Sequence, residues 1–132
     1  MKSFNSYVKV RYAETDQMGV VHHGNYAQYF EIARIEWLND LGISYANIEK
    51  EGVMLPVFEL NIKYHKPLHF SEKLKIVTQL RDIPNVKIIF DYQIFDEGEN
   101  LTTSASSVLV FMDVKTKKPI RCPQYILDKL QN

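Results

Sequence analysis

The segment from Tyr12 to Tyr26 holds the densest group of chemically competent residues in this chain. Asp16 supplies a carboxylate, and two adjacent histidines follow it within eight residues. Gly19 and Gly24 allow the backbone to bend sharply and to approach a ligand closely. A helix that begins directly after this segment presents unpaired N–H groups at the positive end of its dipole. The segment therefore combines a carboxylate with donors for a developing negative charge.

This combination is suited to acyl transfer. Such a reaction needs a group that activates a nucleophile and donors aimed at the oxygen that becomes negative. Asp16 is the candidate for the first role, and the backbone N–H of His23, helped by Gly24 or Asn25, is the candidate for the second. From spacing alone, an equally good interpretation is that Asp16 only closes a turn through an Asx-type hydrogen bond. We interpret the His23 side chain as a positioning group rather than an acid or base.

Hydrophobic periodicity places this segment between a strand and a long helix. Alternation of bulky and polar residues predicts a strand from Tyr7 to Tyr12. Apolar residues spaced by three or four predict a helix from Asn25 to Leu41, and apolar residues on its other sides indicate that it is enclosed. Weaker patterns predict a second helix over Ser44 to Glu51, capped by its serine, and a tail helix over Gln124 to Leu130.

The remainder of the chain is dominated by β-strand patterns. Strands are predicted at Leu55 to His65, Leu74 to Asp82, Lys87 to Asp96 and Leu101 to Lys115. One strand, one enclosed helix and a meander of four long strands predict a single α+β domain over residues 1–132, in which a five-stranded antiparallel sheet wraps around one long central helix. Because both sheet edges are open, we predict pairing with a second copy, as a homodimer at least.

Composition excludes several classes of function. The chain is 45% apolar and 24% charged, with a formal net charge of zero, so nucleic acid is not an expected partner. Cys122 has no second cysteine for a disulfide, and together with His65 and His69 it is too scattered for a metal site. The absence of an export signal and of any apolar run of about 20 residues predicts a cytoplasmic protein without a transmembrane segment.

The run YAETDQMGVVHHGNYAQYFEIARIEWL resembles the signature of the 4-hydroxybenzoyl-CoA thioesterase-like family, which includes the YbgC-type acyl-CoA thioesterases. The residues that carry the resemblance are Asp16, Gly19, Val20, His23, Asn25, Tyr26, Phe30, Glu31, Ala33 and Arg34. A weaker likeness at Tyr64, Pro67, Leu74 and Val77 extends it over the whole domain. Two positions depart from the family: Ser71-Glu72 replaces a common Gly-Asp, which is expected to affect only a turn, and His22 replaces a common aromatic residue, which is expected to alter acyl selectivity.

The resemblance implies a hotdog fold and hydrolysis of an acyl-CoA, or less often of an acyl-carrier-protein thioester, to a free acid and a thiol. It implies that Asp16 acts as nucleophile or as general base on water, while the main chain of His23 polarises the thioester carbonyl. It also implies dimers or tetramers with the pantetheine arm at the subunit interface. Neither a metal nor a redox cofactor is expected, since coenzyme A is part of the substrate.

Four further residues are expected to position the substrate: Gly24, Asn25, Tyr26 and Glu31. Asn25 is expected to cap the helix, and Tyr26 to shape the loop. Glu31 is either a buried general base or a structural residue that pairs with Arg34 or hydrogen-bonds back to the loop, and we favour the structural role.

Two other functions stay open from the sequence: a non-catalytic acyl-thioester binding or scaffold protein, and a 3-hydroxyacyl-thioester dehydratase. Two features of the substrate site also stay open. The sequence does not choose among the basic residues that could meet the phosphates of coenzyme A, which are Lys63, Lys66, Arg81, Lys117 and Lys118. It does not define the acyl preference either.

Overall fold

The structure, a computed structural model, describes residues 3–131. Its helices are α1 (Tyr26–Asp40), α2 (Tyr45–Lys50) and α3 (Gln124–Gln131), with short 3-10 turns at Tyr12–Glu14 and His23–Asn25. Its strands are β1 (Ser3–Lys9), β2 (Val53–Met54), β3 (Val57–Tyr64), β4 (Lys73–Leu80), β5 (Lys87–Phe95), β6 (Leu101–Val110) and β7 (Met112–Asp113). All three predicted helices are therefore confirmed, each within one residue at either end.

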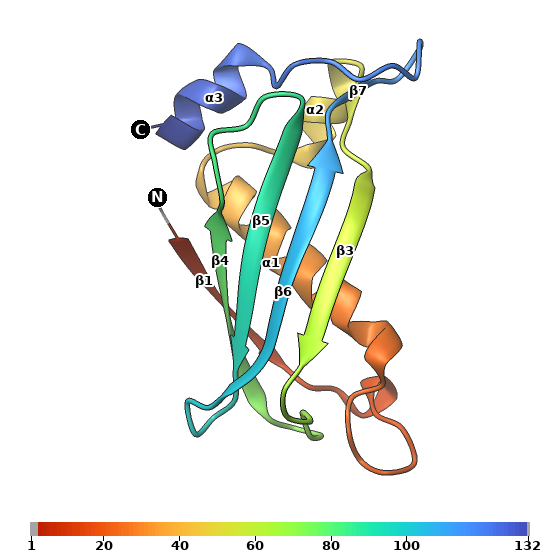
Figure 1. Cartoon of the computed structure of the whole chain (residues 1–132), viewed down its shortest axis with the longest axis vertical. Helices are drawn as coiled ribbons and strands as arrows, with labels where there is room; N and C mark the ends of the chain where they lie inside the picture. The colour runs from red at the N-terminus through yellow and green to blue at the C-terminus, as the bar shows by residue number, and fades with distance from the viewer. Residues whose placement is uncertain (1–2, 132) are drawn as a thin grey trace.

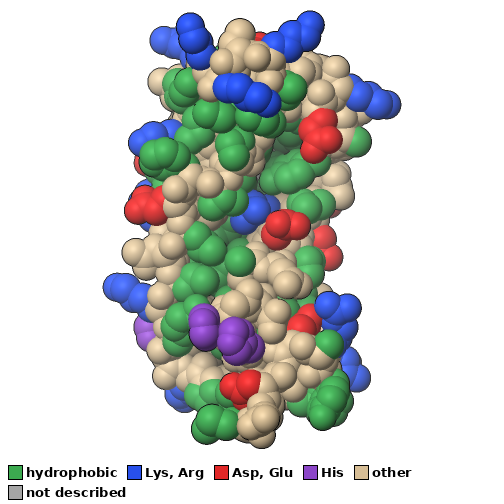
Figure 2. Space-filling view, turned by 90° about the vertical axis from the view of Figure 1, so that its right-hand side faces the viewer, with side chains coloured by type: hydrophobic (Ala, Val, Ile, Leu, Met, Phe, Trp, Pro, Cys, Tyr) green, Lys and Arg blue, Asp and Glu red, His purple; other side chains and the backbone are tan. Residues whose placement is uncertain are grey.

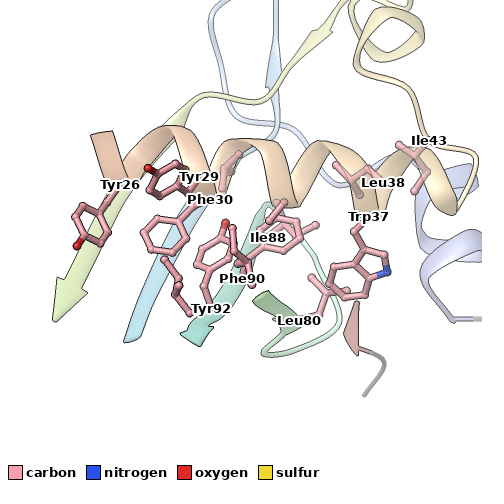
Figure 3. Packing of buried hydrophobic residues seen from close by; sticks show 14 of the residues in the cluster. Tyr26, Tyr29, Phe30, Trp37, Leu38, Ile43, Leu80, Ile88, Phe90 and Tyr92 are labelled. Atoms are coloured by element: carbon pink, nitrogen blue, oxygen red, sulfur yellow. The ribbon is translucent and has the colours of Figure 1, made fainter. Parts of the chain in front are cut away.

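Helix α1 lies across one face of a five-stranded sheet, and the core fills the space between them (Figure 1). Aromatic side chains on the helix meet aromatic side chains of β5: the Phe30 and Tyr92 ring centroids are 4.6 Å apart, and those of Trp37 and Phe90 are 6.1 Å apart (Figure 3). Burial of a large apolar side chain stabilises the fold by roughly 1.5–3 kcal/mol. This layer therefore fixes the direction of α1 and the position of the loop that precedes it.

The strand order is β1-β4-β5-β6-β3, with every neighbouring pair antiparallel. The predicted meander of four consecutive strands is wrong for one strand, because β3 pairs with β6 at the far edge instead of with β4. The reason is that β1 pairs with β4 from Ser3–Gln79 to Lys9–Lys73, so β4 has no free edge for β3. Strands β1 and β3 thus form opposite edges of the five-stranded sheet (Figure 1).

Several predicted boundaries move. The first strand ends at Lys9 rather than Tyr12, since the chain enters a 3-10 turn. The segment predicted at Leu101 to Lys115 ends at Val110, because Met112–Asp113 forms β7 and pairs with β2 in a separate two-stranded sheet. The segment predicted at Leu55 to His65 is reduced to Val57–Tyr64. Ser44 caps α2 as predicted, with its hydroxyl accepting the Asn47 N–H at 3.1 Å.

The prediction that α1 is enclosed is only half right. Its buried side faces the sheet, but Glu31 and Ile32 are exposed on other sides of the helix, the latter by 40%. Within residues 3–131, no helix is long and apolar enough to cross a membrane.

Candidate active site

Asp16 sits in a tight turn that carries the loop back along itself. The turn is closed by the Asp16 N–H to the Val20 carbonyl at 2.9 Å and by the Gly19 N–H to the Asp16 carbonyl at 3.0 Å. Gly19 has a φ of 79°, a conformation that glycine adopts without strain. Bridges from Thr15 to Val21 and from Val20 to His69 hold this turn against the rest of the chain.

The two oxygens of the Asp16 carboxylate have different environments. Oδ1 accepts the N–H of Met18 at 2.8 Å and that of Val20 at 3.4 Å, which is the predicted Asx-type closure. Oδ2 accepts no hydrogen bond from the residues that the structure describes. The structural role and the chemical role therefore do not exclude each other, because one oxygen braces the turn and leaves the other available to a ligand. Asp16 lines a hollow of about 440 Å³.

The amides that lead into α1 are almost all engaged. The Gly24 N–H donates to His22 Nδ1 at 3.0 Å, and the Asn25 N–H donates to the His22 carbonyl at 2.9 Å. The Tyr26 N–H donates to the His23 carbonyl. The His23 N–H, in contrast, has no acceptor in the described part of the chain. Of the three amides predicted as oxyanion donors, those of Gly24 and Asn25 therefore already have acceptors, whereas that of His23 does not.

The side chain of Asn25 braces the loop instead of capping the helix. Asn25 occupies the N-cap position of α1, but its side chain makes no capping hydrogen bond. Its Nδ2 donates to the main-chain oxygen of Glu14 at 2.9 Å, across the base of the loop. The predicted cap is therefore wrong, because the side chain is drawn to a carbonyl eleven residues earlier.

Tyr26 and His23 line a second hollow of about 290 Å³, together with Tyr64, His65 and Lys66. Tyr26 is buried and packs edge-on to Tyr64, with ring centroids 4.8 Å apart. Burial, with a smaller contribution from Tyr64, raises the pKa of Tyr26 to about 12. Figure 2, which views the side of the molecule at the β3 edge, shows histidines gathered at its lower end. The hollow that Asp16 lines does not include His23, so the single chain does not bring the two groups into one pocket.

Glu31 does not behave as predicted. It is exposed on α1 and makes no hydrogen bond or ion pair within residues 3–131. Arg34, its proposed partner, is buried and turns to the sheet, where its Nη1 donates to the Tyr92 hydroxyl at 3.1 Å. The two side chains separate because Glu31 lies on an open side of the helix and Arg34 lies on the side that faces the sheet.

The sequence interpretation missed Glu14, which is only 6% exposed. Its Oε1 accepts the Arg11 N–H at 2.9 Å and the Tyr29 hydroxyl at 2.8 Å, and its Oε2 accepts Arg11 Nε at 2.9 Å. A carboxylate that accepts the N–H of the N-cap residue three positions earlier is one half of a capping box. The spacing of Arg11 and Glu14 was the available signal, although arginine is not the usual first member of that pattern.

Two of the basic residues considered for the phosphates of coenzyme A can be placed relative to the site. Arg81 is engaged in an ion pair with Asp91, with Nη2 and Oδ1 2.7 Å apart, whereas Lys66 lies at the His23 hollow. No three His, Cys, Asp or Glu side chains converge to hold a metal among the described residues.

Comparisons with known proteins place this loop and fold in a family. The profile of the thioesterase-like superfamily matches residues 10–130. The chain belongs to this superfamily. It is similar to a solved structure from Staphylococcus aureus described as a DHNA-CoA thioesterase, with 40% identity, a TM-score of 0.92 and coverage of 99% of this chain and 88% of that chain. The hotdog fold is thereby confirmed.

Two curated members of the superfamily support the same class of chemistry. YneP of Bacillus subtilis (strain 168), named provisionally as an acyl-CoA thioesterase, is 40% identical over 114 residues, which cover 86% of this chain and 83% of the relative. YbgC of Escherichia coli O157:H7, an acyl-CoA thioester hydrolase, is 28% identical over 120 residues, which cover 91% of this chain and 90% of the relative. This member of the thioesterase-like superfamily is therefore an enzyme, a thioester hydrolase.

Proposed function

We propose that this enzyme hydrolyses the thioester bond of an acyl-CoA, with Asp16 as its catalytic carboxylate and the His23 N–H as its oxyanion donor. The observation that carries the proposal is the His23 amide just before α1, which has no acceptor among the described residues, whereas the neighbouring Gly24, Asn25 and Tyr26 amides already have acceptors. An N–H without a protein acceptor, at the positive end of a helix, is suited to a developing oxyanion.

The chemistry follows from these two groups. In one route, the Asp16 carboxylate takes a proton from water as the water oxygen attacks the thioester carbon, and the negative oxygen accepts the His23 N–H. The carbon–sulfur bond then breaks, and the thiolate of coenzyme A takes up a proton. In the other route, Asp16 attacks first and forms a mixed anhydride, which water hydrolyses. Both routes give a free acid and coenzyme A.

The edge strand β3 supports a homodimer or a homotetramer built from such dimers. β3 bonds only to β6, and its exposed side chains include Val57, Phe58, Leu60 and Tyr64, of which Phe58 is 73% exposed. Figure 2 shows hydrophobic side chains spread along this side of the molecule. An open edge with apolar side chains is normally covered. Pairing of β3 with a second β3 would also cover the open side of the His23 hollow, which Tyr64 lines.

The oligomeric state is testable at this edge. Leu60→Arg is expected to convert the wild-type dimer or tetramer to monomer in sedimentation equilibrium, because it places a charge in the centre of the proposed interface. Tyr7→Arg, at the exposed opposite edge strand, is the matched control and should leave the assembly intact. A monomeric wild-type protein at micromolar concentration would overturn the proposal.

Release of free thiol tests the activity. The panel comprises short, medium, long and aromatic acyl-CoAs, including 1,4-dihydroxy-2-naphthoyl-CoA, because the similar Staphylococcus aureus structure is described as a DHNA-CoA thioesterase. Wild type is expected to turn over at least one substrate, and Asp16→Asn to lose about 10²-fold or more in kcat while still binding coenzyme A.

The control for this experiment is Asp40→Asn, the same substitution at an exposed position near the end of α1, which should leave kcat unchanged. Equal rates for wild type and Asp16→Asn would remove Asp16 from the chemistry and direct attention to Glu31. Tight binding of coenzyme A without turnover by wild type would instead support a binding or scaffold protein.

A further inference from the structure

Glu14 lies two residues before Asp16 and is buried where the loop meets α1. Its carboxylate joins two parts of the chain that are far apart in sequence, because one oxygen accepts from both the Arg11 N–H and the Tyr29 hydroxyl. The Tyr29 ring is fully buried along the first turn of α1, beside Tyr26 and Phe30 (Figure 3). The Glu14 side chain is therefore tied directly to the helix.

The main chain of Glu14 holds the other side of the same loop. Its carbonyl oxygen accepts the His22 N–H at 2.9 Å and the Asn25 Nδ2 at 2.9 Å. These two donors lie on either side of His23 in the chain, so both ends of the turn that presents the His23 N–H are attached to one peptide. The side-chain contacts of Glu14 determine where that peptide sits relative to α1.

We infer that Glu14 is a positioning residue that fixes the direction of the His23 N–H through its hydrogen bond with Tyr29. This inference rests on the proposed function. Glu14 does not need to contact the substrate, because it acts through the turn of residues 22–25. A carbonyl oxygen that must meet a single amide is sensitive to the placement of that amide, and a misplacement of about 1 Å can cost about 10²-fold in rate.

The charge of Glu14 suits this role. Burial alone would raise the pKa of Glu14, but hydrogen bonds from the Arg11 amide, the Tyr29 hydroxyl and the Arg11 guanidinium outweigh it and leave the pKa below its ordinary value. The carboxylate is thus ionised at neutral pH and accepts three hydrogen bonds. Glutamine would present an N–H group to one of those donors, so Glu14→Gln keeps the shape of the side chain but cannot satisfy every partner.

Tyr29→Phe is the sharpest test, because it removes one hydroxyl from a buried ring and leaves the carboxylate and the ring packing in place. Tyr7→Phe, which removes an exposed hydroxyl, is its matched control, and Glu36→Gln on an exposed side of α1 is the control for Glu14→Gln. Thermal unfolding establishes that each variant is folded at the assay temperature.

The expected kinetic result is a fall in kcat of about tenfold or more for Tyr29→Phe and Glu14→Gln, with KM changed by less than about threefold. A loss of folded protein would lower the apparent kcat as well, so a second readout is needed. The probe is a ketone analogue of the best acyl-CoA, in which a methylene replaces the thioester sulfur and the carbonyl carbon is ¹³C. Its C=O stretch, measured by infrared difference spectroscopy, reports directly on the hydrogen bond from the amide.

In the wild-type complex the labelled band is expected at lower wavenumber than in buffer, and in the Tyr29→Phe complex it should return towards the buffer position. If the band in the Tyr29→Phe complex stays at its wild-type position, or if both folded variants keep kcat within about twofold of wild type, the role of Glu14 is overturned and the proposed function stays intact. Absence of turnover by wild type on every acyl-CoA would instead remove the proposed function, and this inference with it.

Discussion

Two buried charges lie in different parts of the molecule and differ in how completely they are bonded. Glu14, at the base of the loop, is 6% exposed, and both of its carboxylate oxygens accept hydrogen bonds. Arg34, in the layer between α1 and the sheet, is 4% exposed, and it has no carboxylate partner within residues 3–131. Its Nη1 donates to Tyr92, while its Nε is buried without an acceptor among the described residues.

The two charges differ in how their removal from water is compensated. A charge taken out of water is tolerated when all of its hydrogen bonds are replaced, and Glu14 meets that condition. Arg34 depends on the hydroxyl of Tyr92, which in turn lies 2.6 Å from Ser107 Oγ. We therefore expect the Glu14 network to matter for the loop and the rate, and the Arg34 network to be sensitive to loss of a single hydroxyl.

The largest effect on stability is expected for Tyr92→Phe. The substitution keeps the ring that packs on Phe30 but removes the hydroxyl that accepts from the Arg34 guanidinium. A hydrogen bond to a charged group contributes about 1.5–3 kcal/mol, so the free energy of unfolding should fall by about that amount. Urea denaturation measures it, with Tyr7→Phe as the exposed control. A loss below about 0.5 kcal/mol would mean that water replaces the hydroxyl around Arg34.

An intermediate effect on the free energy of unfolding is expected when the pH is lowered. It comes from Glu14 and not from Arg34. Hydrogen bonds hold the pKa of Glu14 in the folded protein below its ordinary value of 4.5. A group with a depressed folded pKa contributes stability above its unfolded pKa, and that contribution is lost as the pH falls through the folded pKa. Arg34 stays charged throughout, since burial, which lowers its pKa, is outweighed by its electrostatic interaction and hydrogen bond with Tyr92, which raise it.

The measurement is the free energy of unfolding from urea denaturation, for wild type and Glu14→Gln, between about pH 3 and pH 7. The difference between them should be constant above about pH 5.5 and shrink as the pH falls below 4.5. Subtracting the variant removes the contributions of Asp96 and Asp113, whose pKa values are also lowered by hydrogen bonds to the backbone. A difference that does not vary with pH would show that the carboxylate is not bonded in solution as described.

The same comparison explains which parts of the site were readable from the sequence. Helix α1 was predictable because its apolar spacing is a local property, and the turn closed by the Asp16 side chain because its residues are continuous in the chain. Glu14 was not, since a carboxylate two residues from another carries no sign of which one will be buried. Its burial depends on Tyr29, fifteen residues later, and on the direction of the helix. Local periodicity does not encode such a contact.

Strand order and two side-chain roles failed for a related reason. Each strand of the five-stranded sheet was recognisable from its own residues, but the position of β3 depends on the pairing of β1 with β4. Asn25 was predicted to cap α1 because asparagine commonly does so, whereas a carbonyl of the loop competes successfully for its side chain. Glu31 was assigned to a buried partner because the open side of α1 was not foreseen. In every case the deciding contact joins segments that are distant in the sequence.

The smallest effect is expected for Arg34→Met, and it sharpens the comparison most. Methionine retains an unbranched stem in the apolar layer and removes the charge together with the unpaired Nε. Tyr92 keeps Ser107 as a partner, so the substitution leaves no new buried charge. Replacement of buried charges by apolar groups of similar size is often neutral or stabilising.

The free energy of unfolding of Arg34→Met, measured by urea denaturation, should therefore differ from that of wild type by less than about 1 kcal/mol. Arg34→Ala, measured in the same way, opens a cavity and should cost more. A loss of more than about 2 kcal/mol for Arg34→Met would contradict this expectation. It would mean that the charge of Arg34 contributes to stability, as that of Glu14 does. In solution an anion or a second copy of the chain would then bind the Arg34 guanidinium.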